Sequence, residues 1–363
     1  MKLVRDILRR AERHFAEGGR LRPARPVYEA LENFFFAPAT RTACAPHTRD
    51  PLDVKRYMSM VIVALMPCVA ASIYFFGWRL VPMILVSYAA GGAVEVIFAI
   101  LRKEPIAEGF LVTGMLFPLI LPPALPLWMV AAGVAFGVLV GKEVFGGTGR
   151  NLFNPAVVGR VFLTLAYAPT MAKSWIAAGG AWPGRLGQYV SASTVDAVSQ
   201  ATPLGLAPAQ RGSVSLWDLL IGNVSGSAGE TCALAILLGG GFLVAVRVAN
   251  WRTVAAILGS FLAVAAGMHL AAPAQVPTPA WWLMSGGLLF GAFFMATDPV
   301  TSPTTRGGKW IYGILIGVLV ALIRRAEGFP EGMMFAILLG NIAAPILDEV
   351  VVHFRLRRLR NEA

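Results

Sequence analysis

Long apolar runs constrain the fold of this chain more than any other feature of its sequence. Runs of about 18–22 apolar residues recur along the 363 residues, and a helix of about this length is needed to cross the hydrocarbon core of a bilayer. Hydrophobic residues make up 56% of the chain and charged residues 14%, a composition that excludes an ordinary soluble domain. The sequence therefore predicts an all-α polytopic membrane protein with about ten transmembrane helices. The predicted spans are 57–77, 79–101, 108–123, 126–145, 154–169, 228–248, 253–271, 280–298, 309–324 and 331–352, of which the third and fifth are short.

The basic residues are distributed unequally between the two sides of these spans. If the N-terminal arm is cytoplasmic, 24 of the 31 Lys and Arg residues lie on the cytoplasmic side. Cytoplasmic loops of membrane proteins carry such an excess of basic residues, so we expect both termini in the cytoplasm. The loop 170–227 is then external, which means periplasmic in a Gram-negative bacterium. Topology explains the net charge of +11, and no nucleic-acid partner is expected.

Two apolar segments far apart in the chain are similar to each other. LVTGMLFPLILPP (111–123) and LLFGAFFMATDPV (288–300) both combine a glycine with a proline break, and a Trp-led span follows each. We therefore expect two five-helix repeats in inverted orientations, with broken helices near the midplane. Chance similarity between apolar segments is the alternative. The predicted domains are a cytoplasmic arm (1–56), a first repeat (57–169), an external loop with the segment 214–224 at the interface (170–227), a second repeat (228–352) and a basic cytoplasmic tail (353–363).

Two acidic residues next to predicted helix breaks are candidate functional groups. Ionisable side chains at membrane depth are costly, so each is a functional hypothesis by default. Glu143 ends the fourth span and Asp298 ends the eighth. Carboxylates and backbone carbonyls at such breaks are hard oxygen ligands of the kind that a sodium ion prefers. For Glu143, a structural ion pair with Lys142 or Arg150 is the alternative.

The other candidate ligands carry weaker signals. Glu331 opens the tenth span, where a first-turn acidic residue is favoured by the helix dipole. Asp348 closes that span and is equally compatible with an interfacial position.

The three cysteines, Cys44, Cys68 and Cys232, are widely separated in the chain. A zinc or iron–sulfur site formed by this chain alone is therefore not expected.

A glycine-rich turn, VFGGTGRN (144–151), follows the fourth span. Consecutive glycine N–H groups can bind an anion, but a nucleotide-binding P-loop also requires a Lys that this turn lacks. Glycines equally allow a flat ring to approach the backbone. Both interpretations stay open at this point.

Four long segments resemble one family of membrane proteins. They are GKEVFGGTGRNLFNPAVVGR (141–160), LLIGNVSGSAGET (219–231), FFMATDPVTSPTTRGGKWIYGILIGVLVALIR (293–324) and PEGMMFAILLGNIAAPILD (330–348). These motifs are similar to the B subunit of the sodium-translocating NADH:quinone oxidoreductase (Nqr) and to the related D subunit of the Rnf ferredoxin:NAD oxidoreductase. The resemblance covers nearly the whole chain. It implies a subunit of a bacterial inner-membrane complex that passes NADH-derived electrons to quinone, such as ubiquinone, and exports Na⁺.

Two features separate the Nqr and Rnf branches of this family. The arm segments YEALENFFFAP (28–38) and HTRDPLDVKRYMSM (47–60) are similar to Nqr, whereas SQATPL (199–204) is closer to the Rnf form. We favour an Nqr-type subunit. An Rnf-type subunit with the same flavins and no quinone site of its own is the alternative. A channel of the urea or ammonium type, also built from five-span inverted repeats, is a rival from a different class.

The resemblance gives the external loop a chemical role. Family members carry FMN esterified through its phosphate to a threonine, which a flavin transferase attaches within the pattern D-x-x-S/T-G-A-T/S. In this chain Asp196, Ser199, Ala201 and Thr202 match that pattern, and Gln200 replaces the glycine. The resemblance therefore implies covalent FMN on Thr202. An ordinary Ser/Thr turn is the alternative.

The family also implies a second, non-covalent flavin and a quinone site. The second flavin is riboflavin; no motif places it residue by residue, and we assign it provisionally to Asn154. By position, Gly146 and Gly147 correspond to glycines near the quinone on the cytoplasmic side.

The same resemblance implies ion-coupling residues and partners. Glu143, Asp298 and Asp348 correspond to acidic residues of sodium coupling, and Glu29 in the arm is a weaker candidate. The expected partners are the other subunits of a six-subunit Nqr or Rnf complex, above all the FMN-bearing C- or G-type subunit. Membrane lipid and, during maturation, the flavin transferase complete the expected set.

Overall fold

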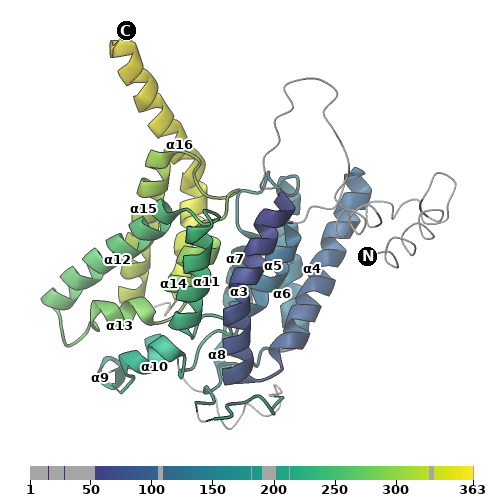
Figure 1. Ribbon diagram of the computed structural model, residues 1–363, viewed down its shortest axis with the longest axis vertical. Helices are drawn as coiled ribbons and strands as arrows, with labels where there is room; N and C mark the ends of the chain where they lie inside the picture. The colour runs from purple at the N-terminus through teal and green to yellow at the C-terminus, as the bar shows by residue number, and fades with distance from the viewer. Residues whose placement is uncertain are drawn as a thin grey trace.

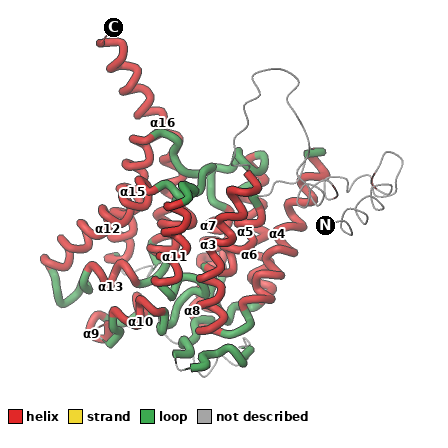
Figure 2. The backbone as a smooth tube through the Cα atoms, viewed as in Figure 1, coloured by secondary structure: helices red, strands yellow, loops and turns green. Residues whose placement is uncertain are grey.

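The computed structural model describes residues 54–104, 109–180, 182–189, 202–211, 213–326 and 331–362, together with Phe15 and Tyr28. Within these ranges the chain is built from helices and connecting loops and contains no β-strand (Figures 1 and 2). Most of the predicted arm, including Glu29, lies outside the described residues. The expectation of an all-α polytopic membrane protein is confirmed.

The helices of the first half follow the predicted order. They are α3 (Val54–Phe76), α4 (Leu80–Arg102), α5 (Phe110–Leu119), α6 (Leu127–Gly141) and α7 (Pro155–Ala166). Shorter elements follow: η2 (Glu143–Phe145), α8 (Ala168–Lys173), η4 (Pro203–Gly205), α9 (Pro208–Arg211) and α10 (Leu216–Ile221). The short α10 occupies the segment that the sequence predicts to be too short for a span.

The second half has the corresponding succession of elements. They are α11 (Ala233–Ala245), α12 (Trp251–Ala271), α13 (Pro279–Met284), α14 (Leu288–Phe290), the π-helical turn η5 (Gly291–Met295), α15 (Arg306–Arg325) and α16 (Met333–Glu362). In Figure 1 the first half lies on one side of the molecule and the second half on the other.

Six of the ten predicted spans are single helices long and apolar enough to cross a membrane: Arg56–Phe76, Leu80–Arg102, Leu127–Phe145, Trp251–Ala271, Arg306–Arg325 and Met333–Asn361. The third, fifth and sixth are shorter, with 10, 12 and 13 residues in α5, α7 and α11. The eighth is divided into α13, α14 and η5. The predicted broken helices are therefore present.

Each helix break lies at a proline or glycine that interrupts the helix. At each break, a buried arginine donates hydrogen bonds to the backbone carbonyl groups that the break leaves without helical partners. The first break follows α5, where Pro118 lies in the last helical turn; the second separates α13 from α14 at Gly286, whose φ is +63°. Arg160 donates to the carbonyl of Ile120 beyond α5. Freed carbonyls at membrane depth require such donors, because no bulk water reaches them.

Arg324 performs the equivalent task in the second half. Its guanidinium donates to the carbonyl oxygens of Trp282 (2.5 Å) and Ser285 (2.9 Å), at the break that follows α13. Both halves therefore stabilise an interrupted helix with an arginine from another element.

The first helices of the two halves pack against each other in opposite directions. Tyr57 at the start of α3 donates to the carbonyl of Val248 beyond the end of α11 (2.6 Å). Further along, Gly239 of α11 lies against the carbonyl of Ala64 in α3. This antiparallel pair is the arrangement expected of an inverted repeat.

In the first half, α6 runs parallel to α4 and antiparallel to α7. Arg79 precedes α4 and donates to the carbonyl of Leu125 just before α6 (2.9 Å), so the two helices start side by side. Gly159 of α7 lies against the carbonyl of Gly133 in α6. Small residues at such crossings let helix backbones approach closely, as is common in membranes.

The second half repeats this packing. Gly313 and Gly317 of α15 lie one turn apart and face the backbone of α12, where Gly317 lies against the carbonyl of Ile257. On its other side, α15 packs antiparallel to α16, whose Gly340 lies against the ring of Tyr312. Thus α15 relates to α12 and α16 as α6 relates to α4 and α7.

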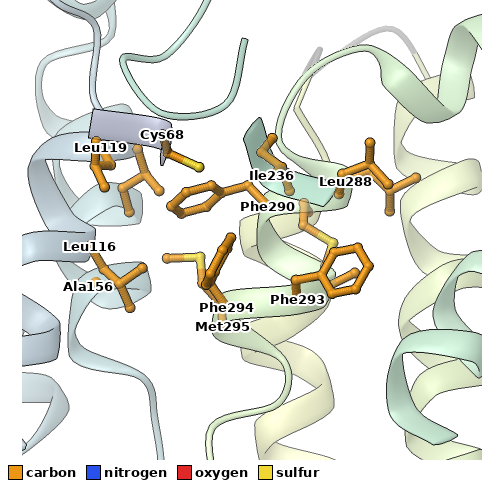
Figure 3. Packing of buried hydrophobic residues seen from close by; sticks show 14 of the residues in the cluster. Cys68, Leu116, Leu119, Ala156, Ile236, Leu288, Phe290, Phe293, Phe294 and Met295 are labelled. Carbon is orange, nitrogen blue, oxygen red and sulfur yellow. The ribbon is translucent and has the colours of Figure 1, made fainter. Parts of the chain in front are cut away.

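The hydrophobic core lies where the two halves meet. Figure 3 shows Phe290, Phe294 and Met295, from α14 and η5, among side chains of the first half that include Cys68 and Leu116. All five residues belong to one cluster of buried apolar side chains. The broken helix of the second half therefore forms the centre of the molecule.

The molecule has two distinct ends. The basic end carries the Lys- and Arg-containing connections at 102–103, 142–150, 247–252 and 306–309 and the C-terminal part of α16. The opposite end carries α8, α9, α10 and α13 (Figure 1). The start of α3 and the end of α16 lie toward the basic end, as the predicted topology requires.

Candidate functional site

A cavity of about 70 Å³ lies between the two halves near the basic end; we call it the interhalf cavity. This volume is several times what one water molecule needs. Residues of α3, α5, the glycine-rich turn, α11 and η5 line it. Its polar and aromatic lining consists of Tyr57, Thr113, Lys142, Thr148, Asn151, Asn154, Phe293, Phe294, Thr297 and Asp298.

Asn154 has a local structural task on the wall of this cavity. Its side-chain oxygen accepts from the N–H of Ala156 (3.0 Å), which caps the N-terminus of α7, and Pro155 follows at the first helical position. Asn and Pro at these two positions favour a helix start. Asn154, which the sequence analysis assigns to a ligand site, therefore caps α7 and also lines a cavity.

Asn341 and Tyr312 connect Asn154 to the second half. Both are fully buried. In the amide orientation that satisfies its neighbours, Asn341 donates to Tyr312 Oη (3.0 Å) and to the carbonyl of Ile337 (3.2 Å) and accepts from the backbone N–H of Asn154 (3.3 Å). The start of α7 is thus tied to α15 and α16.

A second cavity, of about 330 Å³, opens beside the glycine-rich turn; we call it the glycine-turn cavity. Gly146 and Gly147 line it, with φ of +110° and +90°. L-residues rarely adopt these angles, so glycine is required for the turn itself. The remaining lining residues are Glu95, Phe98, Ala99, Arg102, Glu104, Glu143, Thr148 and Arg150.

Glu143 forms an ion pair, as the alternative interpretation of the sequence has it, but with a partner other than Lys142 or Arg150. Its buried carboxylate pairs with Arg102, with 2.6 Å between Nη1 and Oε2, and the same guanidinium donates to the Glu143 carbonyl. Lys142 instead pairs with Glu95 at 2.6 Å. Sequence proximity suggests Lys142 or Arg150 for Glu143, but the parallel packing of α4 and α6 brings the end of α4 to this carboxylate.

Asp298 lies in the turn after η5, on the wall of the interhalf cavity. Its carboxylate accepts from the hydroxyl of Thr301 (3.0 Å) and the N–H of Val300 (3.3 Å). Tyr57 and Tyr312 lie within electrostatic range of this carboxylate. Among the predicted ion-coupling residues, Asp298 is the one that faces the interhalf cavity.

Asp348 has a structural environment at the N-terminus of α15. Its carboxylate accepts from the backbone N–H groups of Thr304 (2.6 Å) and Thr305 (3.0 Å) and from both of their hydroxyls. Four donors and the positive end of a helix dipole stabilise it there. This geometry favours a link between α16 and α15 over a mobile ion site.

Glu331 also has a different environment from the one the sequence suggests. It precedes α16 rather than lying in its first turn, and its carboxylate pairs with the buried Arg160. Arg160 also reaches Glu230, at 3.2 Å, and the hydroxyl of Ser227. One guanidinium therefore joins α7, the loop before α11 and the start of α16.

The three acidic residues that are predicted for ion coupling and lie within the described ranges do not gather into one site. Glu143 faces the glycine-turn cavity, Asp298 faces the interhalf cavity and Asp348 lies at the start of α15. Within the described ranges, no three His, Cys, Asp or Glu side chains are close enough to hold a metal ion.

Thr202 lies at the opposite end of the molecule, just before η4. Its backbone is extended and its side chain makes no capping hydrogen bond. Pro203, next along the chain, lines a cavity of about 340 Å³, the Thr202 cavity. Buried Leu204 packs against Gly286, in the break between α13 and α14.

The rest of the attachment motif lies outside the described residues; this applies to Asp196, Ser199, Gln200 and Ala201. After the turn, the guanidinium of Arg211 donates to the carbonyls of Leu206 (3.0 Å) and Gln275 (3.3 Å). These contacts fix the segment that follows Thr202 to the connection between α12 and α13.

Sequence reasoning missed the pairing of the buried charges. Glu95 and Lys142 are both visible as ionisable residues at membrane depth, but nothing in their spacing of 47 positions indicates a contact. Charge counting assigns Arg324 to the external side of the membrane, at the end of the ninth span, whereas the structure buries it against the break that follows α13. In each case a buried polar group needs a partner, and tertiary packing determines which one.

Comparisons with known proteins agree with this architecture. Residues 41–356 match the model of the NQR2, RnfD, RnfE family. The B subunit of the Na(+)-translocating NADH-quinone reductase from Azotobacter vinelandii is 38% identical over 411 aligned positions, which cover 98% of each chain. The proteins of the same name from Pseudomonas aeruginosa and Klebsiella pneumoniae are 38% and 37% identical and cover 98% and 99% of each chain. The chain therefore belongs to the NQR2, RnfD, RnfE family.

Proposed function

We propose that this chain is a membrane subunit of a sodium-translocating NADH:quinone reductase in a bacterial inner membrane. In this proposal it carries covalent FMN and a second flavin and passes NADH-derived electrons to quinone while Na⁺ is exported. The observation that carries the proposal is the distribution of its cavities. Thr202 adjoins one cavity at the opposite end, and two further cavities adjoin each other at the basic end. A subunit that transfers electrons across a membrane needs sites for electron carriers at both of its ends.

The surroundings of Thr202 fit a tethered FMN. The threonine hydroxyl makes no capping bond, the backbone is extended, and a cavity of about 340 Å³ begins at the next residue. Buried Leu204 and the Arg211 contacts hold the turn in place. Thr202 would supply the ester oxygen, and the cavity would receive the ring.

The chemistry of its lining, rather than its volume of about 70 Å³, supports the interhalf cavity as the place of the second, non-covalent flavin. A flavin ring is larger than this volume, so the two halves would have to move apart to hold it. The cavity wall combines aromatic rings with hydrogen-bonding groups, and the buried hydroxyl of Thr148 has no hydrogen-bond partner within the described part of the chain. Asn154 would help to hold the ring, while its cap keeps the start of α7 in place. When bound, the flavins supply the redox chemistry, and the protein supplies position, electrostatics and exclusion of water.

The glycine-turn cavity is the proposed quinone site. A volume of about 330 Å³ lies within the range of small-molecule pockets, and Gly146 and Gly147 line it beside the side chains of Arg102 and Arg150. Thr148 lines this cavity and the interhalf cavity. A quinone and a flavin in these two places would be neighbours.

The basic end faces the cytoplasm in this proposal, and the Thr202 turn faces the periplasm. The excess of Lys and Arg at the basic end supports this orientation. The proposed partners are the other subunits of the complex, with an FMN-bearing subunit docking near Thr202 and the flavin transferase acting there during maturation.

Replacing Thr202 tests the proposal. We expect Thr202→Val to abolish in-gel flavin fluorescence of the denatured subunit, because the ester oxygen is lost. Thr278→Val is the matched control: Thr278 also precedes a proline and makes no capping bond, at the start of α13. A dark band from the unaltered protein, in cells that express the transferase, would exclude covalent flavin and favour the channel interpretation.

Asp298 is the ion-coupling residue that the geometry supports best. We expect Asp298→Ala to reduce sodium-stimulated turnover several-fold while flavin content changes little, because the carboxylate faces the interhalf cavity and packs on Thr301. Glu349→Gln, an exposed change one residue beyond Asp348, serves as the control. Unchanged sodium dependence in Asp298→Ala would remove this residue from the ion path. We also propose Glu143, Asp348 and Glu29 as ion-coupling residues, with less support from the geometry than Asp298.

An Rnf-type subunit is the second candidate, because Gln200 departs from the Nqr form of the motif. It would carry the same flavins and lack a quinone site of its own. Neighbouring genes distinguish the two: an Nqr A subunit supports our proposal, and a cluster-rich ferredoxin-like subunit supports Rnf.

A further inference from the structure

The interhalf cavity and the glycine-turn cavity share a wall that contains a buried ion pair. Lys142, at the end of α6, lines the interhalf cavity, and Glu95 of α4 lines the glycine-turn cavity. Lys142 Nζ lies 2.6 Å from Glu95 Oε1, and each side chain is only 5% exposed. Thr148 lines both cavities beside them.

This pair is incompletely satisfied. The second carboxylate oxygen of Glu95 and the hydroxyl of Thr148 are buried and have no hydrogen-bond partner within the described residues. Burial of two charges is costly, and an apolar pair of similar size would often be as stable. A buried pair with an unused oxygen at a cavity wall is therefore better explained by function than by stability.

The neighbouring charges leave Lys142 without a second counter-ion at close range. Glu143 is engaged by Arg102. Glu104 and Arg150 also line the glycine-turn cavity, but both are exposed. Across the interhalf cavity, the charge that faces Lys142 is Asp298.

We propose that Lys142 balances the negative charge that an electron carrier in the interhalf cavity gains on reduction, and that Glu95 balances Lys142 while the carrier is oxidised. The inference rests on the proposed function, which puts the non-covalent flavin in this cavity. The electrons come from NADH and leave to quinone. Lys142 and Glu95 form or break no covalent bond and change no oxidation state.

The physical basis is the strength of charge interactions in a dry site. In a medium of low dielectric constant, a fixed cation at a cavity wall stabilises an added electron far more than it would in water. Removing the cation should therefore make the carrier harder to reduce. Removing its counter-ion should make the carrier easier to reduce.

A redox titration of the intact complex, followed by flavin absorbance, tests this pair. We expect Lys142→Met to shift the midpoint potential of the non-covalent flavin to a more negative value. Glu95→Gln should shift it to a more positive value, and the double variant should return toward the unaltered complex. Lys103→Met, which removes an exposed lysine outside both cavities, should leave the potential unchanged.

Opposite shifts separate a charge effect from a structural one. Shifts of the same sign in the two single variants, or no shift in either, overturn the inference. If Lys142→Met does not assemble, Glu95→Gln carries the test alone, and an unchanged or more negative potential overturns the inference. Absence of a non-covalent flavin from the unaltered complex refutes the proposed function itself.

Discussion

Arg160→Met should leave almost no folded protein. The change removes the cation that pairs with Glu230 and Glu331 and the donor that satisfies the Ile120 carbonyl. Truncating one partner of a buried charge pair commonly costs about 3–5 kcal/mol, and here two carboxylates lose their cation together. We expect the yield of monodisperse protein in mild detergent, followed by fluorescence-detected size exclusion, to fall at least ten-fold.

Two further variants test whether the loss of a buried charge, rather than the loss of any arginine, destabilises the cluster of Arg160, Glu230 and Glu331. Arg325→Met removes an exposed arginine at the end of α15, outside this cluster, and should leave the yield near that of the unaltered protein. Combining Arg160→Met with Glu230→Gln and Glu331→Gln should restore part of the yield, since neither carboxylate is then left without its cation. Normal yield of Arg160→Met alone would show that the cluster does not stabilise the fold.

Gly239→Ala should destabilise the contact between the two halves. A Cβ at this position would lie 2.0 Å from the carbonyl oxygen of Ala64, so α3 and α11 must move apart. Overpacking of this kind typically costs about 1–3 kcal/mol. We expect a clearly lower midpoint of thermal unfolding in detergent.

Gly241, two residues further along the same helix, provides a matched control. A Cβ there has no heavy atom within 4 Å, and alanine is preferred over glycine in a helix by about 1 kcal/mol. Gly241→Ala should therefore unfold at the same or a higher temperature. Equal effects of the two substitutions would mean that α11 does not approach α3 closely.

Apolar periodicity was sufficient to predict the order of the helices. The proline-rich break after α5 and the broken eighth span also follow from local sequence, because Pro118 and Gly286 act on their own backbone. The lengths of α7 and α11 were harder to predict. Residues 228–232, before α11, form a loop that is buried by the protein rather than by lipid, and hydropathy does not distinguish the two environments. After α7, the predicted span continues into the separate short helix α8.

The candidate site was predictable only in part. The glycine-rich turn and Asp298 face cavities, as residues of a functional site should. The partners of Glu143, Lys142 and Glu331 were not predictable, because each pairing joins helices that are distant in the chain. Asn341 carries no motif of its own, and only the packing of α16 against α7 and α15 gives it a role.

The attachment turn has a mechanical consequence through Leu204. This side chain packs against Gly286 in the interrupted helix of the second half, and Arg211 ties the same turn to Gln275. These contacts attach the residues that follow Thr202 to the second half. If a flavin is attached to Thr202 as proposed, rocking of one half against the other would change its distance from the interhalf cavity, and with it the rate of the proposed electron transfer.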